Sequence, residues 1–410
     1  FVIHPINLEA VSYIAAGSNT LLFLFGILAL NKLASPIENL QKYFIAGVLL
    51  LAAILTNEAG ISWILIALIF LLISKKANFR KVFALLSPVV VIYVFLRVFV
   101  SQSTFEKFGY IPIAKLSFTE RLSSIPKIIS YYLTTFIYPA NLSIAQHWTV
   151  QNLDFKNFYL PLILVLITTT LFVFGAIHLF NHHRKQFTLY VFFALWFMFG
   201  IGPYLQLIPA DMTVADRWFY LPIGGLLGML GLLIQNIKIS LKYKKAITIL
   251  TYIIILPLSI RTMVRNTNWK DAPTLYTHDL QINPESFDLH AKLASELLSN
   301  KQYNEAFVHA QKAVSLQADD ISSLGVLSVL YLHYNEPNQA IPHLQKLLER
   351  DSANYPALTS LIYAYLLIKD FDSAERYSNE ALKSYPKDRS ITSLLEMSKA
   401  RLPVTPTEQY

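Results

Sequence analysis

Long apolar segments dominate the first 260 residues of this 410-residue chain and constrain its fold more than any other feature. A helix needs about 20 mostly apolar residues to cross a bilayer. Eight segments approach or reach that length: Ile14–Leu30, Tyr43–Leu55, Ile61–Ile73, Val82–Val100, Phe158–Phe180, Phe187–Leu207, Phe219–Gln235 and Ala246–Ile260. The second and third are short enough to be one broken element, but two thin spans joined by a tight turn are favoured. We therefore predict a helical membrane domain over residues 1–260.

Basic residues indicate how this domain is oriented. Residues 1–260 carry 19 basic and 8 acidic side chains, whereas residues 261–410 carry 15 and 18. The excess positive charge of the first part gathers in four short loops, at 31–42, at 75–81, around Arg184 and Lys185, and at 238–245. Short loops rich in Lys and Arg stay in the cytoplasm, so we place all four there. The net charge of +8 then reflects membrane orientation and not a nucleic-acid partner.

The segment 121–139 complicates this topology because it contains the apolar stretch Ile128–Tyr138. With the four basic loops on one side, the spans alternate correctly only if this segment dips into the membrane or lies flat on it. A ninth span is the alternative, and it would invert one half of the topology. The favoured interpretation places the other polar segments, and everything after Ile260, outside the cytoplasm.

The last 150 residues repeat with a period of 34, which is typical of tetratricopeptide repeats. Small residues recur where the two helices of each repeat touch, as at Ala306, Ala340 and Ala374. We predict an α-solenoid over 261–402, with a half repeat, repeats at 287–320, 321–354 and 355–388, an end helix, and a tail at 403–410. Such an array offers a concave surface for a peptide or protein.

Ionisable residues beside the apolar segments are candidate functional residues. Glu58 lies between two apolar runs and Arg97 lies near the end of another. A charge in such a place is costly without a partner or a water-filled cavity, so a functional site and a structural Glu–Arg pair are equally good interpretations. His4 and Glu9 lie near the start of the chain, where a His before Pro is more often a packing residue than a ligand.

The stretch Asp211–Pro222 is the densest polar and aromatic cluster. Aromatic residues at a membrane interface account for its rings, but not for Asp216 and Arg217 beside them. The guanidinium group of an Arg suits a phosphate. The sequence contains no Cys, which excludes disulfides, Cys-ligated zinc and thiol nucleophiles. No Gly-rich phosphate loop, metal-ligand spacing or Ser-His-Asp arrangement stands out, so we predict no metal site.

Five motifs before the repeats resemble, in the same order, the transmembrane and tetratricopeptide-repeat-containing protein family. They are HPINLEAVSYIAAGSNTLLFLF, TNEAGISW, RLSSIPKIISYYLTTFIYPANLS, VADRWFYLP and RTMVRNTNWKDAPTLY. The resemblance implies a GT-C membrane glycosyltransferase, similar to protein O-mannosyltransferases, which takes sugar from a polyprenyl-phosphate lipid. The family's Lys-Glu becomes Asn57-Glu58, and its Glu-Arg-Tyr becomes Asp216-Arg217-Trp218. We thus expect an all-α fold: a partial GT-C-like membrane domain followed by an α-solenoid.

The resemblance also implies roles for the candidate residues. Arg217, Arg97 and Arg121 are the expected cations for the donor phosphate, whereas His4, Glu9, Glu58, Asp216 and Tyr220 are expected to orient the site. In this family the acidic pair that serves catalysis precedes the His-Pro motif. The chain opens on Phe1 and not on Met, so we interpret it as a fragment and expect no catalytic residue within it.

We therefore expect a membrane glycosyltransferase that transfers sugar from a polyprenyl-phosphate donor to a protein or peptide hydroxyl, with the repeats recruiting the acceptor. The alternative is a non-catalytic membrane scaffold whose repeats bind partners. A third, weaker alternative is a polymerase or ligase that acts on a lipid-linked glycan. The sequence leaves open the sugar, the acceptor and any divalent metal. Its Lys- and Ile-rich, Cys-free composition favours a prokaryotic plasma membrane over endoplasmic reticulum.

Overall fold

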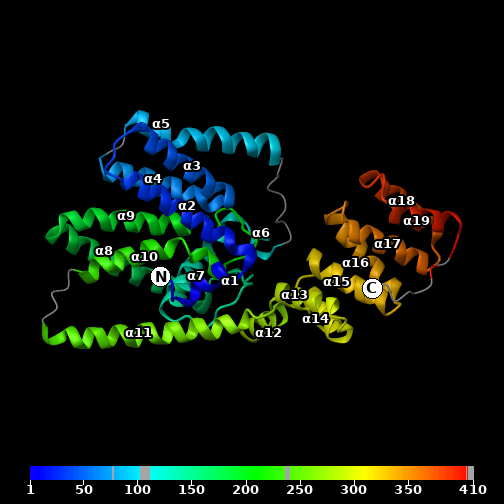
Figure 1. Cartoon of the computed structure of the whole chain (residues 1–410). Helices are drawn as coiled ribbons and strands as arrows, with labels where there is room; N and C mark the ends of the chain where they lie inside the picture. The colour runs from blue at the N-terminus through cyan, green and yellow to red at the C-terminus, as the bar shows by residue number, and fades with distance from the viewer. Residues whose placement is uncertain (76–77, 102–110, 236–240, 403, 405–410) are drawn as a thin grey trace. The chain divides into compact units, whose positions relative to one another are not determined.

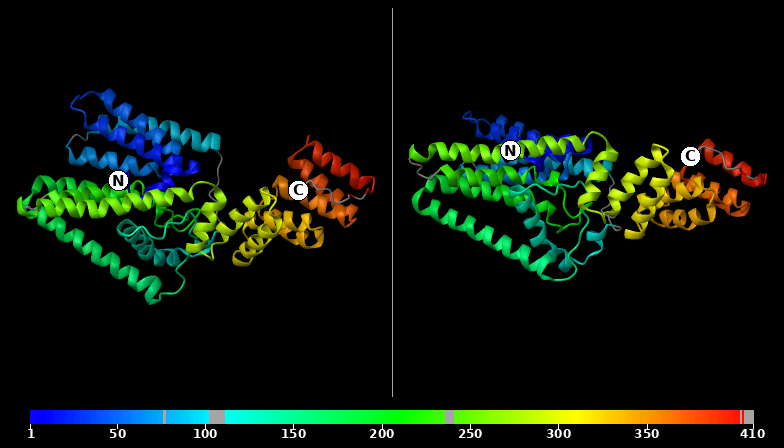
Figure 2. Two further views of the ribbon diagram at one scale, coloured as in Figure 1. Left: turned by 60° about the horizontal axis from the view of Figure 1, so that its bottom comes forward. Right: turned by 90° about the horizontal axis from the view of Figure 1, so that it is seen from below.

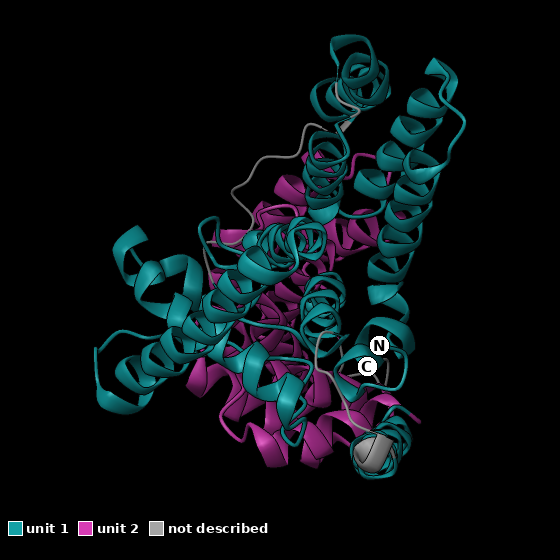
Figure 3. Ribbon diagram, turned by 90° about the vertical axis from the view of Figure 1, so that its left-hand side faces the viewer, with its two compact units in different colours: residues 1–269 teal, residues 270–410 magenta. Residues whose placement is uncertain are grey.

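The computed structural model describes residues 1–75, 78–101, 111–235, 241–402 and 404, and the elements in these ranges are helices (Figure 1). The chain forms two compact units, Phe1–Trp269 and Lys270–Tyr410 (Figure 3). The all-α fold class is confirmed. The predicted boundary at residue 260 falls inside a helix that continues to Asn268. The described ranges exclude residues 76–77 and 238–240 of two expected cytoplasmic loops, and most of the predicted tail.

The longer helices of the amino-terminal unit are α2 (Gly17–Ala34), α3 (Leu40–Thr56), α4 (Ile61–Ile73), α5 (Phe79–Pro88), α7 (Phe118–Ile137), α8 (Leu160–His182), α9 (Arg184–Ile201), α10 (Pro222–Gln235) and α11 (Leu241–Asn268). Short elements connect or extend them: η1 (Pro5–Asn7), α1 (Leu8–Ser12), η2 (Ile14–Ala16), η3 (Glu58–Gly60), η4 (Val89–Tyr93), η5 (Leu96–Ser101), α6 (Pro112–Lys115), η7 (Phe155–Tyr159), η8 (Gly202–Tyr204) and η9 (Asp216–Phe219).

Each of the eight predicted apolar segments coincides with a helix. Among the described residues, five helical segments are long and apolar enough to cross a membrane: Ile14–Ala34, Phe79–Val100, Phe155–His182, Arg184–Tyr204 and Lys245–Asn268. Three shorter apolar helices, at Leu40–Thr56, Glu58–Ile73 and Pro222–Gln235, account for the rest. The second and third predicted segments are thus two helices, α3 and α4. The segment 121–139 lies mostly in α7, which begins with a capping box at Ser117 and Glu120.

Small and aromatic residues hold the helices of this unit together. A Cβ atom added at Gly225 of α10 would lie 2.5 Å from the backbone nitrogen of Phe197 in α9, so the two helices approach as closely as glycine allows. The rings of Trp63 and Trp196 meet with centroids 4.8 Å apart and join α4 to α9. By contrast, α8 and α11 lie at the edges of the unit, and the apolar stretch of α11 is not buried within it (Figure 2).

The repeat unit consists of eight helices in the described part of residues 270–410. They are α12 (Ala272–Ile282), α13 (Phe287–Ser299), α14 (Tyr303–Leu316), α15 (Ile321–His333), α16 (Pro337–Arg350), α17 (Tyr355–Leu367), α18 (Phe371–Ser384) and α19 (Arg389–Lys399). The recurrent Ala306, Ala340 and Ala374 lie in the second helix of each pair and are fully buried, as their spacing predicts. Small side chains at these positions let the paired helices pack closely.

The turns within the three helix pairs also repeat at the 34-residue period. Lys301, Asn335 and Lys369 adopt positive φ values of 59°, 58° and 62°. In each turn the next residue donates its N–H back across the helix end, as Gln302 does to the Leu297 carbonyl. Asn tolerates this left-handed conformation, whereas Lys is strained in it.

Two histidines face each other within the first helix pair. The Nδ1 atoms of His290 and His309 lie 2.8 Å apart, and His290 Nε2 lies 3.0 Å from the Pro284 carbonyl. A carbonyl only accepts, so His290 Nε2 carries a hydrogen and, in the neutral ring, His290 Nδ1 accepts the hydrogen of His309 Nδ1. Burial lowers the pKa of both imidazoles. The lowered pKa values favour neutral rings, in which His290 Nδ1 is the acceptor.

Candidate functional site

His4 ties the start of the chain to the end of α7. Its Nδ1 atom accepts the N–H of Ile6 at 3.3 Å, and its Nε2 atom lies 2.9 Å from the carbonyl oxygen of Phe136. Only a neutral ring with its hydrogen on Nε2 satisfies both contacts. Burial lowers the pKa of His4, which favours the same neutral form. His4 is thus a positioning group in this structure, and both of its ring nitrogens are engaged.

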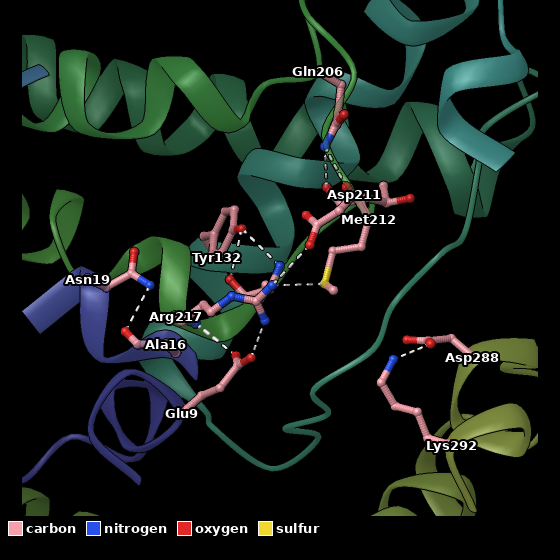
Figure 4. Close-up of polar contacts among 12 residues, drawn as sticks. Glu9, Ala16, Asn19, Tyr132, Gln206, Asp211, Met212, Arg217, Asp288 and Lys292 are labelled. Carbon is pink, nitrogen blue, oxygen red and sulfur yellow. Dashed lines mark hydrogen bonds and ion pairs between the residues drawn. The ribbon is translucent and has the colours of Figure 1, made fainter. Parts of the chain in front are cut away.

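Glu9 and Arg217 form a buried ion pair although 208 positions separate them in the sequence (Figure 4). Arg217 Nη1 donates to Glu9 Oε1 at 2.5 Å, and the Arg217 backbone N–H donates to Glu9 Oε2 at 2.9 Å. The side chains are 3% and 13% exposed, respectively. Burial raises the pKa of the Glu9 carboxyl, while Arg217 and, more weakly, Arg265 oppose that shift. The pair fixes α1 against η9.

The other edge of the Arg217 guanidinium has weaker partners. Arg217 Nη2 lies 3.5 Å from Asp211 Oδ2 and 3.8 Å from Met212 Sδ. The Asp211 side chain is 50% exposed, so this contact is screened by solvent. Arg217 is therefore held firmly on the Glu9 side and loosely on the Asp211 side.

Asp216 accepts a hydrogen bond from α7. The hydroxyl of Tyr131 donates to Asp216 Oδ1 at 2.5 Å and accepts the Nε2 amide hydrogen of Gln146 at 2.6 Å. The neighbouring Tyr132 hydroxyl donates to the Ala215 carbonyl at 3.1 Å. These contacts connect α7, the segment around Gln146 and η9 in one buried network.

Arg121 and Gln206 brace the loop that leads to this network. Gln206 is fully buried, and its amide nitrogen donates to the carbonyls of Met212 and Thr213 at 2.8 and 3.0 Å. Arg121 donates from Nε to the Gln206 carbonyl at 3.0 Å and from Nη1 to the Leu116 carbonyl at 2.7 Å. Arg121 was expected to bind the donor phosphate. Two of its guanidinium nitrogens, Nε and Nη1, instead donate to backbone carbonyls.

Glu58 and Arg97 form a second ion pair, at 3.5 Å between Glu58 Oε1 and Arg97 Nη1. It joins η3 to η5. The Glu58 side chain is 73% exposed, in contrast to the buried Glu9. The structure thus shows the Glu–Arg pairing that the sequence left open as one of two interpretations.

A large apolar cavity of about 1010 Å³ lies beside the His4 contact. Its walls come from the first residues of the chain, the end of α7, α10 and α11, and Arg261 lies among them. Arg261 donates to the carbonyls of Pro139 and Ala140 at 3.2 and 2.6 Å. The expected residue Tyr220 packs edge-on against Phe1, another cavity residue, with ring centroids 5.0 Å apart.

The structure therefore brings His4, Glu9, Asp216, Arg217 and Arg121 onto one connected set of elements, and places Glu58 and Arg97 in a separate pair. Sequence reasoning missed the partners Tyr131, Gln146, Gln206 and Arg261, which carry no short-range signal. Arg261 does fall inside one of the family motifs. Within the described ranges, no group of three or more His, Asp or Glu side chains is arranged to hold a metal ion.

A family model supports the repeats directly. A family model described as tetratricopeptide repeat matches residues 331–397. Those residues are tetratricopeptide repeats. A crystal structure of a tetratricopeptide-repeat domain aligns over 93% of this chain and 98% of its own, at 13% identity and a TM-score of 0.30.

Sequence relatives carry the name protein O-mannosyl-transferase. Human TMTC3 is 26% identical over 132 residues, which cover 32% of this chain and 14% of that protein. Tmtc2 of Drosophila melanogaster is 31% identical over 103 residues, which cover 25% of this chain and 11% of that protein. These matches confirm the resemblance to repeat-containing proteins of this kind. They span a small fraction of the relatives' length.

Proposed function

We propose that this chain belongs to a membrane glycosyltransferase that transfers a sugar from a polyprenyl-phosphate donor to a hydroxyl group of a protein or peptide. In this proposal the amino-terminal unit is a GT-C-like membrane domain with several spans, and its four basic loops lie in the cytoplasm. The proposal extends the names of the O-mannosyl-transferase relatives to a chain that matches only part of them.

The buried network of Glu9, Arg217, Asp216 and Tyr131 is the observation that carries the proposal. A buried ion pair costs desolvation energy and is often no more stable than an apolar replacement. Charged groups next to apolar membrane helices therefore mark candidate functional sites. This network joins three of the segments that carry the family motifs.

Arg217, Arg97 and Arg121 are the proposed cations for the leaving phosphate, and Arg217 is the best oriented of them. Glu9 holds one edge of its guanidinium, which leaves the loosely paired Nη2 edge for a ligand anion. A cation already oriented by the protein stabilises developing negative charge without reorganising. His4, Glu9, Asp216 and Tyr220 orient this part of the site, and Glu58 orients Arg97. The proton acceptor is not assigned to any residue of this chain.

The repeats are proposed to bind the acceptor protein or peptide, because stacked helix pairs present an extended binding surface. The location of the repeats outside the cytoplasm follows from the proposed orientation of the basic loops. A prokaryotic plasma membrane remains the proposed location.

Substitution of Asp211 tests the role of Arg217 with little risk to folding, because the Asp211 side chain is half exposed. If Arg217 binds the phosphate, Asp211→Asn removes a competing anion and lowers the KM for the donor, whereas Arg217→Gln raises it and slows transfer. The measurement is sugar transfer from a polyprenyl-phosphate donor to peptide by the full-length protein. Asp288→Asn, in the repeat unit, is the control for loss of one negative charge. Unchanged kinetics in both Asp211→Asn and Arg217→Gln would refute the assignment.

A non-catalytic membrane scaffold is the second candidate function. It is favoured by the internal pairing of Glu9 with Arg217 and of Glu58 with Arg97, since structural residues satisfy one another. The scaffold hypothesis predicts that the full-length protein transfers no sugar while its repeats still bind a protein partner. Sugar transfer by purified full-length protein would exclude it.

A further inference from the structure

A groove between α3 and α5 combines apolar walls with a positive charge at one end of a candidate membrane span. A Cβ atom added at Gly47 of α3 would clash with the Leu85 carbonyl oxygen of α5, so the two helices touch there (Figure 1). Nearer their starts, side chains of both helices surround a space of about 440 Å³. That volume falls within the range of about 300–1,000 Å³ for ligand pockets. The groove is therefore large enough for part of a lipid.

The walls of this groove are mostly apolar. Leu40 and Phe44 of α3 line one wall, and Phe79, Phe83 and Ala84 of α5 line the other. The first four of these side chains are between 50% and 84% exposed. They lie at the start of a segment that is long and apolar enough to cross a bilayer. Water needs polar partners, so hydrocarbon is the better occupant of such walls.

Arg80 gives the groove a positive charge. Arg80 lines the groove and is exposed, and among the described residues it makes no hydrogen bond or ion pair. The next residue differs, because the Lys81 ammonium group pairs with Glu38 at 3.3 Å, and Glu38 also pairs with Lys42 at 2.9 Å. Arg80 lies in the first turn of α5, where the helix dipole already favours an anion. Within the described part of the chain, the charge that faces the groove thus has no counter-charge.

We propose that this groove binds an anionic phospholipid of the bilayer, with the lipid phosphate against the Arg80 guanidinium and one acyl chain between Phe44 and Phe83. A guanidinium group can donate to a phosphate through two parallel N–H groups. Bilayer hydrocarbon alone accounts for the exposed rings, whereas the cation beside them favours a lipid with an anionic headgroup. A free anion would leave the apolar walls without a partner.

This inference goes beyond the proposed function, because it concerns a phospholipid of the membrane and not the sugar donor. It holds whether or not the full-length protein transfers sugar. Under the proposed orientation, the segment 75–81 lies in the cytoplasm, so the bound phospholipid belongs to the cytoplasmic leaflet.

Lipid titration followed by native mass spectrometry tests this assignment. The full-length protein in detergent is titrated with phosphatidylglycerol or with the zwitterionic phosphatidylcholine, and the Kd of the first bound lipid is measured for each. Arg80→Gln removes the positive charge from the groove. Arg184→Gln is its control, because Arg184 is also an exposed first-turn arginine in an expected cytoplasmic loop but does not line the groove.

Phe83→Ala and Phe99→Ala form a second matched pair. Phe83 is 63% exposed and stacks on Phe79, whereas Phe99 is 68% exposed and its ring contacts Phe95. Both lie on the segment Phe79–Val100, but of the two only Phe83 lines the groove. Because both rings are exposed, their truncation carries little risk to folding, and monodisperse elution checks it.

We expect the wild-type protein to bind phosphatidylglycerol about tenfold more tightly than phosphatidylcholine, because hydrogen bonds between charged groups are strong. Arg80→Gln should remove that preference, and Arg184→Gln should keep it. Phe83→Ala should weaken the binding of both lipids about fivefold, because it removes apolar contact with the acyl chain. Phe99→Ala should bind both lipids as the wild-type protein does.

Four results would overturn the assignment. A preference for phosphatidylglycerol that survives in Arg80→Gln would refute the role of Arg80, and equal affinities of Phe83→Ala and Phe99→Ala would refute the place of the acyl chain. Displacement of phosphatidylglycerol by inorganic phosphate at equal concentration would show that the groove binds a free anion. Tighter binding of a polyprenyl phosphate, lost in Phe83→Ala, would make the groove part of the donor site.

Discussion

The substitution Glu9→Gln should destabilise the amino-terminal unit strongly, because it leaves the Arg217 guanidinium buried without its counter-charge. Arg217 is 13% exposed, and its shortest contact is the one to Glu9. Removing one partner of a buried ion pair costs about 3–5 kcal/mol. The Gln side chain keeps one acceptor oxygen but turns an N–H group towards one of the two Arg217 donors. We therefore expect a loss near the lower end of that range.

Glu58→Gln is the matched control, since it removes the same charge from a Glu–Arg pair that is 73% exposed on the Glu side. An exposed pair contributes about 0–1 kcal/mol, so this substitution should change the free energy of unfolding little. The double variant Glu9→Gln/Arg217→Gln should be less destabilised than the sum of the single variants. A coupling of about 2–3 kcal/mol is expected for groups in direct contact.

Equilibrium unfolding in mixed micelles measures these free energies, with tryptophan fluorescence as the signal. The chain has five tryptophans, and Trp218 directly follows Arg217, so the signal reports on this region. Single-variant losses below about 1 kcal/mol that add without coupling would show that the pair is not buried in the folded protein. If Glu9→Gln and Glu58→Gln lowered the free energy of unfolding equally, the result would contradict the burial of Glu9 and the exposure of Glu58.

Three further predictions follow from other parts of the chain. Lowering the pH below about 6.5, the unfolded pKa of His, should destabilise the repeat unit, because the folded unit holds His290 neutral with a lowered pKa. His290→Gln should weaken the pH dependence of the melting temperature of the repeat unit. An unchanged dependence would show that His290 is not responsible for it. Lys369→Gly should raise the melting temperature by relieving a positive φ, for a gain of about 1 kcal/mol, and a lower value would argue against strain there. Because the chain has no Cys, Asn152→Cys should react with an impermeant maleimide on intact cells and Asn181→Cys only after permeabilisation; the reverse would invert the topology.

The helices of both units follow from patterns that are local in sequence. Apolar length alone predicts eight helical segments among the described residues of the first unit, because a helix satisfies its own backbone hydrogen bonds. The 34-residue period predicts the repeats, because each repeat packs only against its neighbours. The same period predicts that Ala306, Ala340 and Ala374 are buried, and the structure shows them buried.

The partners within the site follow no such local pattern. The sequence marks Asp216 and Arg217 as unusual beside apolar helices, but it does not show that Glu9 pairs with Arg217 or that Tyr131 bonds to Asp216. These pairs depend on how α1 and α7 fold against η9, which is a tertiary property. Arg261 and the cavity are hidden for the same reason, because the cavity walls come from four separate segments.

The two edges of the Arg217 guanidinium differ in how firmly they are held, and the proposed phosphate role depends on that difference. A purely structural arginine would have its whole donor fork satisfied in the interior, because unpaired buried donors cost free energy. Arg217 instead has one edge held by the buried Glu9 and the other turned to Asp211, whose side chain is half exposed. The contact with Glu9 stabilises the fold. The contact with Asp211 contributes little stability, because it is long and screened by solvent. Under the proposed function, this weakly engaged edge is the one that binds the donor phosphate, because a cation oriented in advance needs no reorganisation.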